Sequence, residues 1–189
     1  MPFNLPIALT WLRIAIIPFF VALFYVPDVI LPIGLRDAIA AWLFVVAAIT
    51  DWLDGWLARR WNQTSSFGAF LDPVADKLMV SAALLVLLHL DRVGSLVALI
   101  IIGREIAISA LREWMAQIGA GASVAVHWLG KFKTAAQMIA IPCLLHHNNW
   151  LDLPVALIGQ VLIWVAAALT VWSMFYYLKK AWPEIQART

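Results

Sequence analysis

Charged side chains are scarce in this sequence, and their scarcity excludes an ordinary soluble domain. Only 13% of the 189 residues are Asp, Glu, Lys or Arg, whereas 64% are hydrophobic. A typical soluble domain is about 25% charged and about 45–50% apolar. The mean hydropathy of +0.89 points the same way. A chain of this size could not hide so much apolar surface from water, so lipid must solvate part of it.

Other absences narrow the class further. The single cysteine, Cys143, lies in an apolar run, so no disulfide framework exists. The net charge of +2 is too small to favour a nucleic-acid partner. No basic cluster precedes the first apolar run and no small-residue cleavage site follows it, so we expect that run to stay in the membrane. Without repeats or low-complexity tracts, one membrane domain over residues 1–189 is the simplest organisation.

Apolar stretches near the length of a helical membrane span recur along the chain. Such a span needs about 20 residues. The six stretches are Leu5–Val26, Ala38–Leu57, Val74–Leu90, Val93–Met115, His127–Leu145 and Leu153–Leu178. We therefore predict an all-α polytopic membrane protein with six transmembrane helices.

The distribution of Lys and Arg predicts how these helices are oriented. One set of loops contains only Arg36 and Arg92. The opposite set contains the remaining loop cations, namely Arg59, Arg60, Arg112, Lys131, Lys133, Lys179, Lys180 and Arg188. The side richer in Lys and Arg is normally cytoplasmic. With six spans, both termini are then cytoplasmic.

The most informative segment combines four aspartates with small residues and an arginine. It reads Asp51-x2-Asp54-Gly55-x2-Ala58-Arg59-x8-Gly68-x3-Asp72-x3-Asp76. At about 100° per residue, the second aspartate and the two small residues after it lie within roughly 60° of the first on one helix. The last two aspartates are one turn apart on the next helix. Because a short polar turn joins the helices, we predict two facing carboxylate pairs at the cytoplasmic end.

The chemistry of these residues favours a metal site. Four carboxylates this close repel strongly in a low dielectric, so they either take up protons or bind cations. Oxygen ligands without histidine or cysteine suit Mg²⁺, Mn²⁺ or Ca²⁺ rather than zinc. Gly55 and Ala58 leave room for a bulky group near the backbone, and Arg59 presents a fork suited to phosphate. Together they predict a divalent-metal site that binds a diphosphate.

Each of these residues also has a purely structural explanation. Asp72 before Pro73 is typical of a helix N-cap followed by proline at the first helical position. Gly55 fits close helix packing, and Arg59 fits a charge that sets topology. Four acids at helical spacing near membrane depth are nevertheless costly without a role. The metal site is therefore the favoured interpretation.

The aspartate segment resembles, position by position, the signature of the CDP-alcohol phosphotransferase family. Similarity to bacterial members of that family extends over nearly the whole chain, including FNLPIALTWLRI, REIAISALREWMA, GKFKTAAQM and LTVWSMFYYL. For the members it resembles, the donor is CDP-diacylglycerol and the acceptor is sn-glycerol 3-phosphate. The resemblance implies that the products are phosphatidylglycerophosphate and CMP.

The resemblance also implies residue roles. It places two divalent ions, Mg²⁺ or Mn²⁺, on Asp51, Asp54 and Asp72, with Asp76 completing the site and acting as general base on the acceptor hydroxyl. Contacts to the CDP group are expected from Asn4, Thr10, Gly55, Ala58, Arg59 and Gly68. For Thr10 and the nearby Arg13, an interfacial helix with a snorkelling arginine is the alternative. A homodimer in the bacterial inner membrane, with a laterally open polar cavity facing the cytoplasm, is also expected.

The acceptor needs a phosphate pocket of its own, for which the candidates are Arg104, Arg112, Lys131 and Lys133. Arg104 lies in or near an apolar span, where an unpaired cation is costly. Glu105 and Arg112 are seven residues apart and share a helix face, so we expect an ion pair between them. The alternative for Arg112 and the two lysines is a set of cytoplasmic charges that fix topology or contact anionic lipid.

Two other functions fit parts of the pattern. The same chemistry could use phosphatidylglycerol, as in a cardiolipin synthase, or inositol phosphate as the acceptor; the cationic candidates favour a small phosphate over a lipid. A divalent-cation transporter could also use intramembrane carboxylates. Transporters usually place such groups at the bilayer midplane between repeats, whereas these acids lie near one end and no repeat is present.

Overall fold

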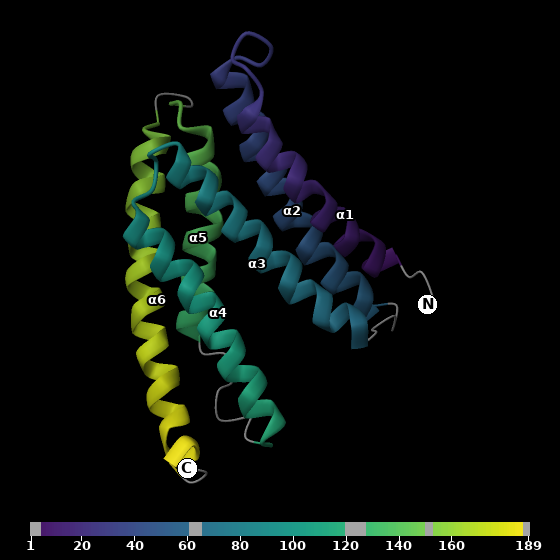
Figure 1. The fold of residues 1–189 in the computed structure, drawn as a ribbon, viewed down its shortest axis with the longest axis vertical. Helices are drawn as coiled ribbons and strands as arrows, with labels where there is room; N and C mark the ends of the chain where they lie inside the picture. The colour runs from purple at the N-terminus through teal and green to yellow at the C-terminus, as the bar shows by residue number, and fades with distance from the viewer. Residues whose placement is uncertain (1–4, 61–65, 120–127, 150–152, 187–189) are drawn as a thin grey trace.

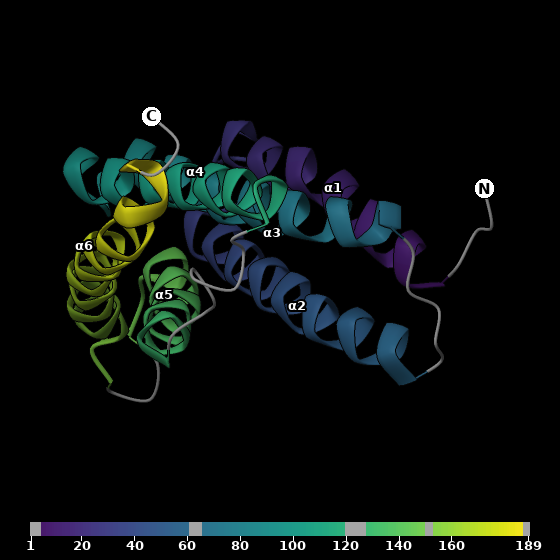
Figure 2. The same cartoon turned by 90° about the horizontal axis from the view of Figure 1, so that it is seen from below.

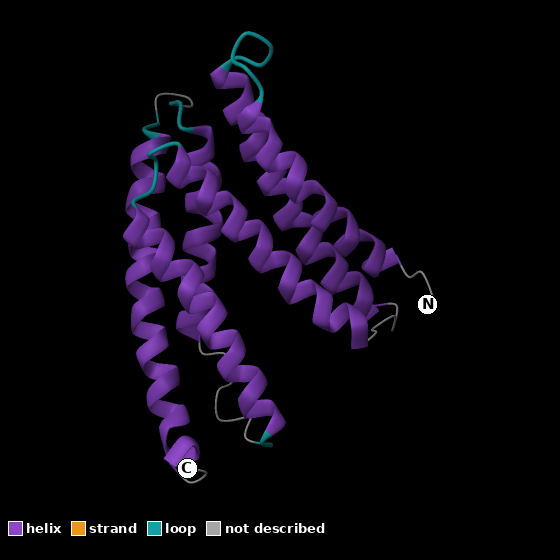
Figure 3. Cartoon of the chain, viewed as in Figure 1, coloured by secondary structure: helices purple, strands orange, loops and turns teal. Residues whose placement is uncertain are grey.

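Helices dominate the structure, a computed structural model that describes residues 5–60, 66–119, 128–149 and 153–186. Regular structure within these ranges is helical (Figure 3). The elements are α1 (Leu5–Ala22), the 3-10 helix η1 (Leu23–Tyr25), α2 (Ile33–Arg60), α3 (Ser66–His89), α4 (Ser95–Gln117), α5 (Trp128–His146) and α6 (Val155–Gln186). The all-α prediction is confirmed, and each predicted span corresponds to one helix.

The helix ends differ from the predicted spans where polar residues continue a helix. The helix α3 begins at Ser66, so Asp72 and Pro73 lie inside it. The interpretation of Asp72 as an N-cap is therefore wrong. The helix α6 runs on to Gln186, past the predicted end of its span.

The six helices form two layers of three. Figure 2 shows α1, α3 and α4 in one layer and α2, α5 and α6 in the other. The layers are joined at their margins, where α1 packs on α2 and α4 packs on α6. The two middle helices, α3 and α5, touch each other only sparingly. In Figure 1, the α1–α3 group and the α4–α6 group diverge toward the ends where α1 begins and α6 finishes.

Alanines are interspersed among larger apolar side chains in the interior, and several tryptophans lie on the exterior. Ala40, Ala83 and Ala140 are fully buried in the main core, while Trp42 and Trp172 are exposed. Small residues let helices approach closely, as is typical of membrane proteins. By length and hydropathy, three helices of the described chain could cross a membrane, over Ala8–Tyr25, Ile33–Leu53 and Val155–Pro183.

The closest helix contact joins α5 and α6 through Gly159. A Cβ atom at this position would lie 2.8 Å from Leu144 Cγ on α5. That separation is shorter than real carbon–carbon contacts, so only glycine fits unless α5 moves. The two helices therefore pack as a tight pair along one side of the molecule (Figure 1).

A buried charge cluster fastens the helices at the end where α3 turns into α4. Arg92, in that turn, pairs with Asp37 on α2 and donates to the backbone oxygens of Leu144 and Leu145 on α5, at 3.2 and 2.7 Å. Gln160 on α6 donates to the backbone oxygen of Arg92 at 2.6 Å. One arginine thus connects α2, α5 and α6. We call Arg92, Asp37 and Gln160 the Arg92 cluster.

Candidate active site

The helix α1 positions aspartates from two other helices. Thr10 and Arg13 are one turn apart on α1, and both are buried. The Thr10 hydroxyl donates to Asp72 Oδ1 on α3 at 2.6 Å, and Arg13 forms an ion pair with Asp51 on α2. Because α2 and α3 contact each other much less than either contacts α1, the two carboxylates are brought together through α1. The predicted facing of α2 and α3 therefore depends on a third helix.

Asp76 lies beside this pair, one turn further along α3. Asp76 and Arg13 line the same small internal cavity. The charges of Asp51 and Arg13 are both within electrostatic reach of the Asp76 carboxylate. Asp51 and Asp76 thus both lie near Arg13, which offsets part of their mutual repulsion, while Asp72 is held by Thr10 one turn away on α1.

The remaining residues of the signature are only partly described. Gly68 on α3 is buried. Four lie on α2 with side chains outside the described part of the chain, namely Asp54, Gly55, Ala58 and Arg59. Asn4 precedes the described residues, and the side chain of Lys131 on α5 also lies outside them. Their predicted roles stay predictions.

The donor chemistry fits a hard divalent ion. Arg13 and Thr10 engage one oxygen each of Asp51 and Asp72, and within the described residues the second oxygen of each carboxylate makes no hydrogen bond. Carboxylate oxygens without nitrogen or sulfur ligands suit Mg²⁺ or Mn²⁺. No group of three potential ligands occurs among the described side chains. Because Asp54 is not among them, the complete four-aspartate site stays a prediction.

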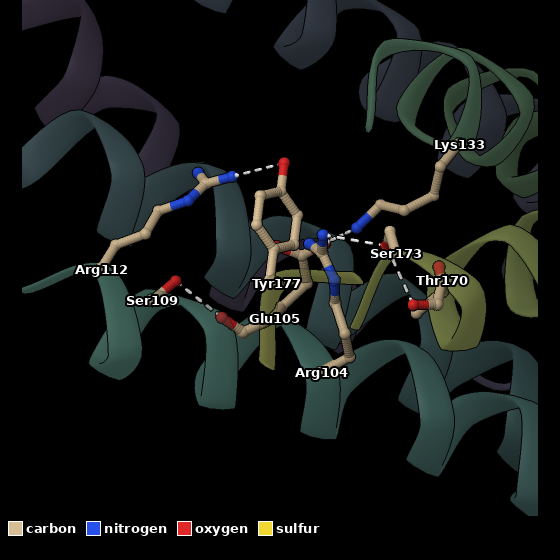
Figure 4. Close-up of polar contacts among 8 residues, drawn as sticks. All are labelled: Arg104, Glu105, Ser109, Arg112, Lys133, Thr170, Ser173 and Tyr177. Atoms are coloured by element: carbon tan, nitrogen blue, oxygen red, sulfur yellow. Dashed lines mark hydrogen bonds and ion pairs between the residues drawn. The ribbon is translucent and has the colours of Figure 1, made fainter. Parts of the chain in front are cut away.

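A second polar cluster lies between α4, α5 and α6 (Figure 4). Arg104 on α4 and Lys133 on α5 are both buried, and both contact Glu105 Oε1. Arg104 also donates to Ser173 Oγ at 3.2 Å, and Arg112 donates to the Tyr177 hydroxyl at 3.4 Å. We call these residues the cation cluster: Arg104, Glu105, Arg112, Lys133, Ser173 and Tyr177.

Three of the four predicted phosphate-binding cations are thus brought together, but their partners differ from the expectation. Glu105 pairs with Lys133 and Arg104 rather than with Arg112. Arg112 instead lies over the Tyr177 ring, at 5.3 Å from its centroid. The expected Glu105–Arg112 pair is therefore wrong. A shared helix face does not decide a pairing when a neighbouring helix supplies a closer cation.

The α6 wall of the cation cluster was missed by the sequence reasoning. Thr170, Ser173 and Tyr177 are all buried, and they follow one another at intervals of three and four residues in an apolar stretch. That spacing places them on one helix face, which was the available signal. Within the described residues, Thr170 Oγ1, Arg104 Nε and Arg112 Nε make no hydrogen bond. Buried polar atoms without partners suit a site that receives a polar ligand.

One cavity connects the two clusters. It measures about 50 Å³, and its lining includes Asp76 and Lys77 from α3, Glu105 from α4, and Thr134 and Gln137 from α5. It lies between the two layers, where α3 and α5 touch sparingly. A group bound on the cation cluster would therefore lie near the Asp76 carboxylate.

Comparisons with known proteins identify the family. The family model for CDP-alcohol phosphatidyltransferases matches residues 3–172. A Haemophilus influenzae protein named CDP-diacylglycerol--glycerol-3-phosphate 3-phosphatidyltransferase is 50% identical over 184 residues, covering 96% of this chain and 95% of its own length. Proteins of the same name from Pectobacterium atrosepticum and Salmonella typhimurium are each 52% identical, over 96% of both chains. The chain belongs to the CDP-alcohol phosphatidyltransferase family.

Proposed function

We propose that this protein transfers the phosphatidyl group of CDP-diacylglycerol to sn-glycerol 3-phosphate, giving phosphatidylglycerophosphate and CMP. The observation that carries the proposal is the cavity that joins Asp76 to the cation cluster. The cavity extends from the Asp76 carboxylate, which can accept a proton, to Glu105, whose partners Lys133 and Arg104 are buried cations able to hold a phosphate monoester. The names of the three relatives, about half identical over nearly the full chain, support the same reaction.

The proton transfer is assigned to Asp76. A primary hydroxyl of the acceptor attacks the phosphorus that bears the diacylglycerol, forming a new P–O bond. The diphosphate P–O bond breaks, CMP leaves with the electron pair, and the hydroxyl proton passes to the Asp76 carboxylate. Arg13 and Thr10 hold Asp51 and Asp72 in fixed orientations. Fixed carboxylates need no rearrangement during reaction, which lowers the barrier.

The donor is bound by the signature residues. We assign the divalent ions, Mg²⁺ or Mn²⁺, to the four carboxylates of the signature: Asp51, Asp54, Asp72 and Asp76. Bound ions of this kind neutralise a diphosphate and stabilise the leaving phosphate. Contacts to CDP are assigned to Asn4, Thr10, Gly55, Ala58, Arg59 and Gly68. Thr10 would then contact the CDP group as well as Asp72, to which its hydroxyl donates a hydrogen bond.

The acceptor phosphate is assigned to the cation cluster, with Arg104, Arg112 and Lys133 as its main contacts and Lys131 as a further candidate. Arg104 and Lys133 are buried, and burial makes a charge–phosphate hydrogen bond stronger than it would be in water. A neutral acceptor would give these cations no partner of opposite charge, and a lipid acceptor would not require a cationic pocket for a small soluble phosphate.

The membrane arrangement belongs to the same proposal. All six helices cross the bacterial inner membrane as one domain, residues 1–189, with the aspartates and the cation cluster facing the cytoplasm, and two copies form a homodimer. The three helices outside the apolar candidate spans carry most of the site, including Asp76, Arg104 and Lys133. Polar residues within a span lower its hydropathy, and such residues normally face the bundle interior.

The test is CMP release by the purified protein given CDP-diacylglycerol and Mg²⁺. Three acceptors are supplied in turn: sn-glycerol 3-phosphate, inositol phosphate and phosphatidylglycerol. We expect release that requires sn-glycerol 3-phosphate. Release with another acceptor would overturn the assigned specificity while keeping the aspartate chemistry. No release with any acceptor, together with uptake of divalent ions into vesicles, would favour a transporter.

A further inference from the structure

Glu105 is the one anion of the cation cluster, and it occupies a central position. Lys133 reaches it from α5 and Arg104 from its own helix, and both contact the same oxygen, Oε1 (Figure 4). Within the described residues, Oε2 accepts no hydrogen bond. The Glu105 side chain is 25% exposed, whereas the side chains of Lys133 and Arg104 are 2% and 7% exposed. Glu105 is thus the more accessible member of the group.

Glu105 lies on the side of the cation cluster that borders the cavity reaching Asp76. Glu105 and Asp76 line the same cavity, and the charge of Glu105 is within electrostatic reach of the Asp76 carboxylate. Arg104, Arg112 and Lys133 do not line that cavity. Going from the cations to Asp76, a ligand would therefore pass Glu105.

The proposed acceptor has three functional groups in a row. Its phosphate is at one end of a three-carbon chain, the attacking primary hydroxyl is at the other, and a secondary hydroxyl lies between them. With the phosphate on the cations and the primary hydroxyl at Asp76, the middle hydroxyl lies in the intervening space. A carboxylate oxygen there accepts a hydrogen bond from a hydroxyl donor.

Resting on the proposed function, we infer that Glu105 is a specificity-determining residue that accepts a hydrogen bond from the middle hydroxyl of the acceptor. Its Oε1 stays with Lys133 and Arg104, and its Oε2 takes the hydroxyl. The Glu105 carboxylate then holds in place the cations that bind the phosphate. It also recognises the hydroxyl on the middle carbon of the acceptor. A phosphate acceptor without that hydroxyl leaves Oε2 without a partner when the cavity fills.

The test compares two acceptors, sn-glycerol 3-phosphate and propane-1,3-diol monophosphate, which lacks the middle hydroxyl. Hydrogen bonds to charged groups are worth enough to change binding roughly 10- to 100-fold. We expect kcat/KM of the unmodified protein to favour sn-glycerol 3-phosphate by about that factor. In Glu105→Gln, which removes the charge and keeps the shape, we expect the preference to fall to a few-fold at most.

The ratio between acceptors separates this role from a structural one. If Glu105 only holds Lys133 and Arg104, Glu105→Gln lowers kcat/KM equally for both acceptors, and the unchanged ratio overturns the inference. Glu113→Gln is the matched control, since Glu113 is exposed on the same helix and is expected to leave the ratio as it is.

Measurements on the unmodified protein alone can also overturn the inference, even where the Glu105 variant fails to fold. Equal turnover of the two acceptors would overturn the inference and leave the proposed function standing. Absence of CMP release with either acceptor would overturn the proposed function, and the inference with it.

Discussion

The molecule contains two buried clusters of opposite charges, and they are built differently. In the Arg92 cluster, the arginine is enclosed by protein partners: a carboxylate from α2, two backbone oxygens from α5 and a glutamine from α6. The cation cluster instead has an excess of positive charge, with one carboxylate among three cations, and that carboxylate lies on a cavity wall.

This difference indicates that the Arg92 cluster has a structural role, whereas the cation cluster is suited to bind a ligand. Around the Arg92 cluster, charge is balanced within the protein, because Arg92 and Arg36 are paired with Asp37 and Asp28. A buried cluster with surplus positive charge favours an anion that supplies the balance. Buried polar atoms without hydrogen bonds, such as Asp37 Oδ1 and Arg104 Nε, occur in both places within the described residues, so the balance of charge rather than the count of hydrogen bonds distinguishes them.

Asp76→Asn should give the largest effect and should act on the reaction rather than on folding. The amide cannot accept the hydroxyl proton, so we expect turnover to fall by roughly 10²- to 10⁴-fold, the usual contribution of a general base. CDP-diacylglycerol binding and the unfolding temperature should change little. CMP release checks the loss of turnover, and thermal unfolding of the same preparation checks that stability is unchanged. Retained turnover would remove Asp76 as the base.

Asp37→Asn, in the Arg92 cluster, should have the opposite effect: it should lower stability and leave substrate binding unchanged. It leaves Arg92 buried without its carboxylate, which typically costs about 3–5 kcal/mol of stability. We expect a much lower unfolding temperature in detergent, with KM for both substrates unchanged in the protein that remains folded. The double replacement Asp37→Leu with Arg92→Met should recover much of the loss. A changed KM for the acceptor would show that the Arg92 cluster shapes the site.

Lys133→Ala should act between these extremes. Loss of one buried phosphate contact is expected to raise KM for sn-glycerol 3-phosphate roughly 10- to 100-fold, because charge-assisted hydrogen bonds are strong. KM for CDP-diacylglycerol should stay nearly constant. Lys180→Ala, which removes an exposed cation of α6, is the control. An equal rise in both KM values would instead indicate a structural charge.

Thr10→Val should give the smallest effect. It removes one neutral donor to Asp72 and keeps the shape of the side chain, so a loss of about 1 kcal/mol is expected. Activity at saturating metal should fall by only a few-fold, and the concentration of Mg²⁺ needed for half-maximal rate should rise. A large loss of the folded protein would mean that Thr10 holds α1 onto α3 rather than tuning the carboxylate.

The local sequence pattern was sufficient to predict the helices, but it was insufficient to predict which side chains pair between helices. Long apolar stretches and the aspartate spacing depend on residues close in sequence, and the structure bears out the helices they predict. The predicted helix ends were wrong where a local sequence signal competed with a tertiary contact. Asp72 before Pro73 has the form of a helix start, yet the Asp72 side chain accepts a hydrogen bond from Thr10 on another helix, and α3 begins earlier, at Ser66.

The pairings could not be derived because they join distant helices. Arg13 and Asp51 are 38 residues apart, and Lys133 and Glu105 are 28 apart. Which helices are neighbours is decided by how the whole bundle packs, and a single sequence does not display that. Ser173 and Tyr177 were overlooked for the same reason: their spacing marks a helix face, but nothing local says which cations it meets.

The ion pair between Arg13 and Asp51 has a consequence for how the protein is made. Arg13 leaves the ribosome before its partner, which follows 38 residues later. A lone arginine is costly in lipid, so α1 should remain at the insertion channel until α2 has emerged. The two helices would then enter the bilayer as a neutralised pair, and the order of synthesis itself would bring the first aspartate to its arginine.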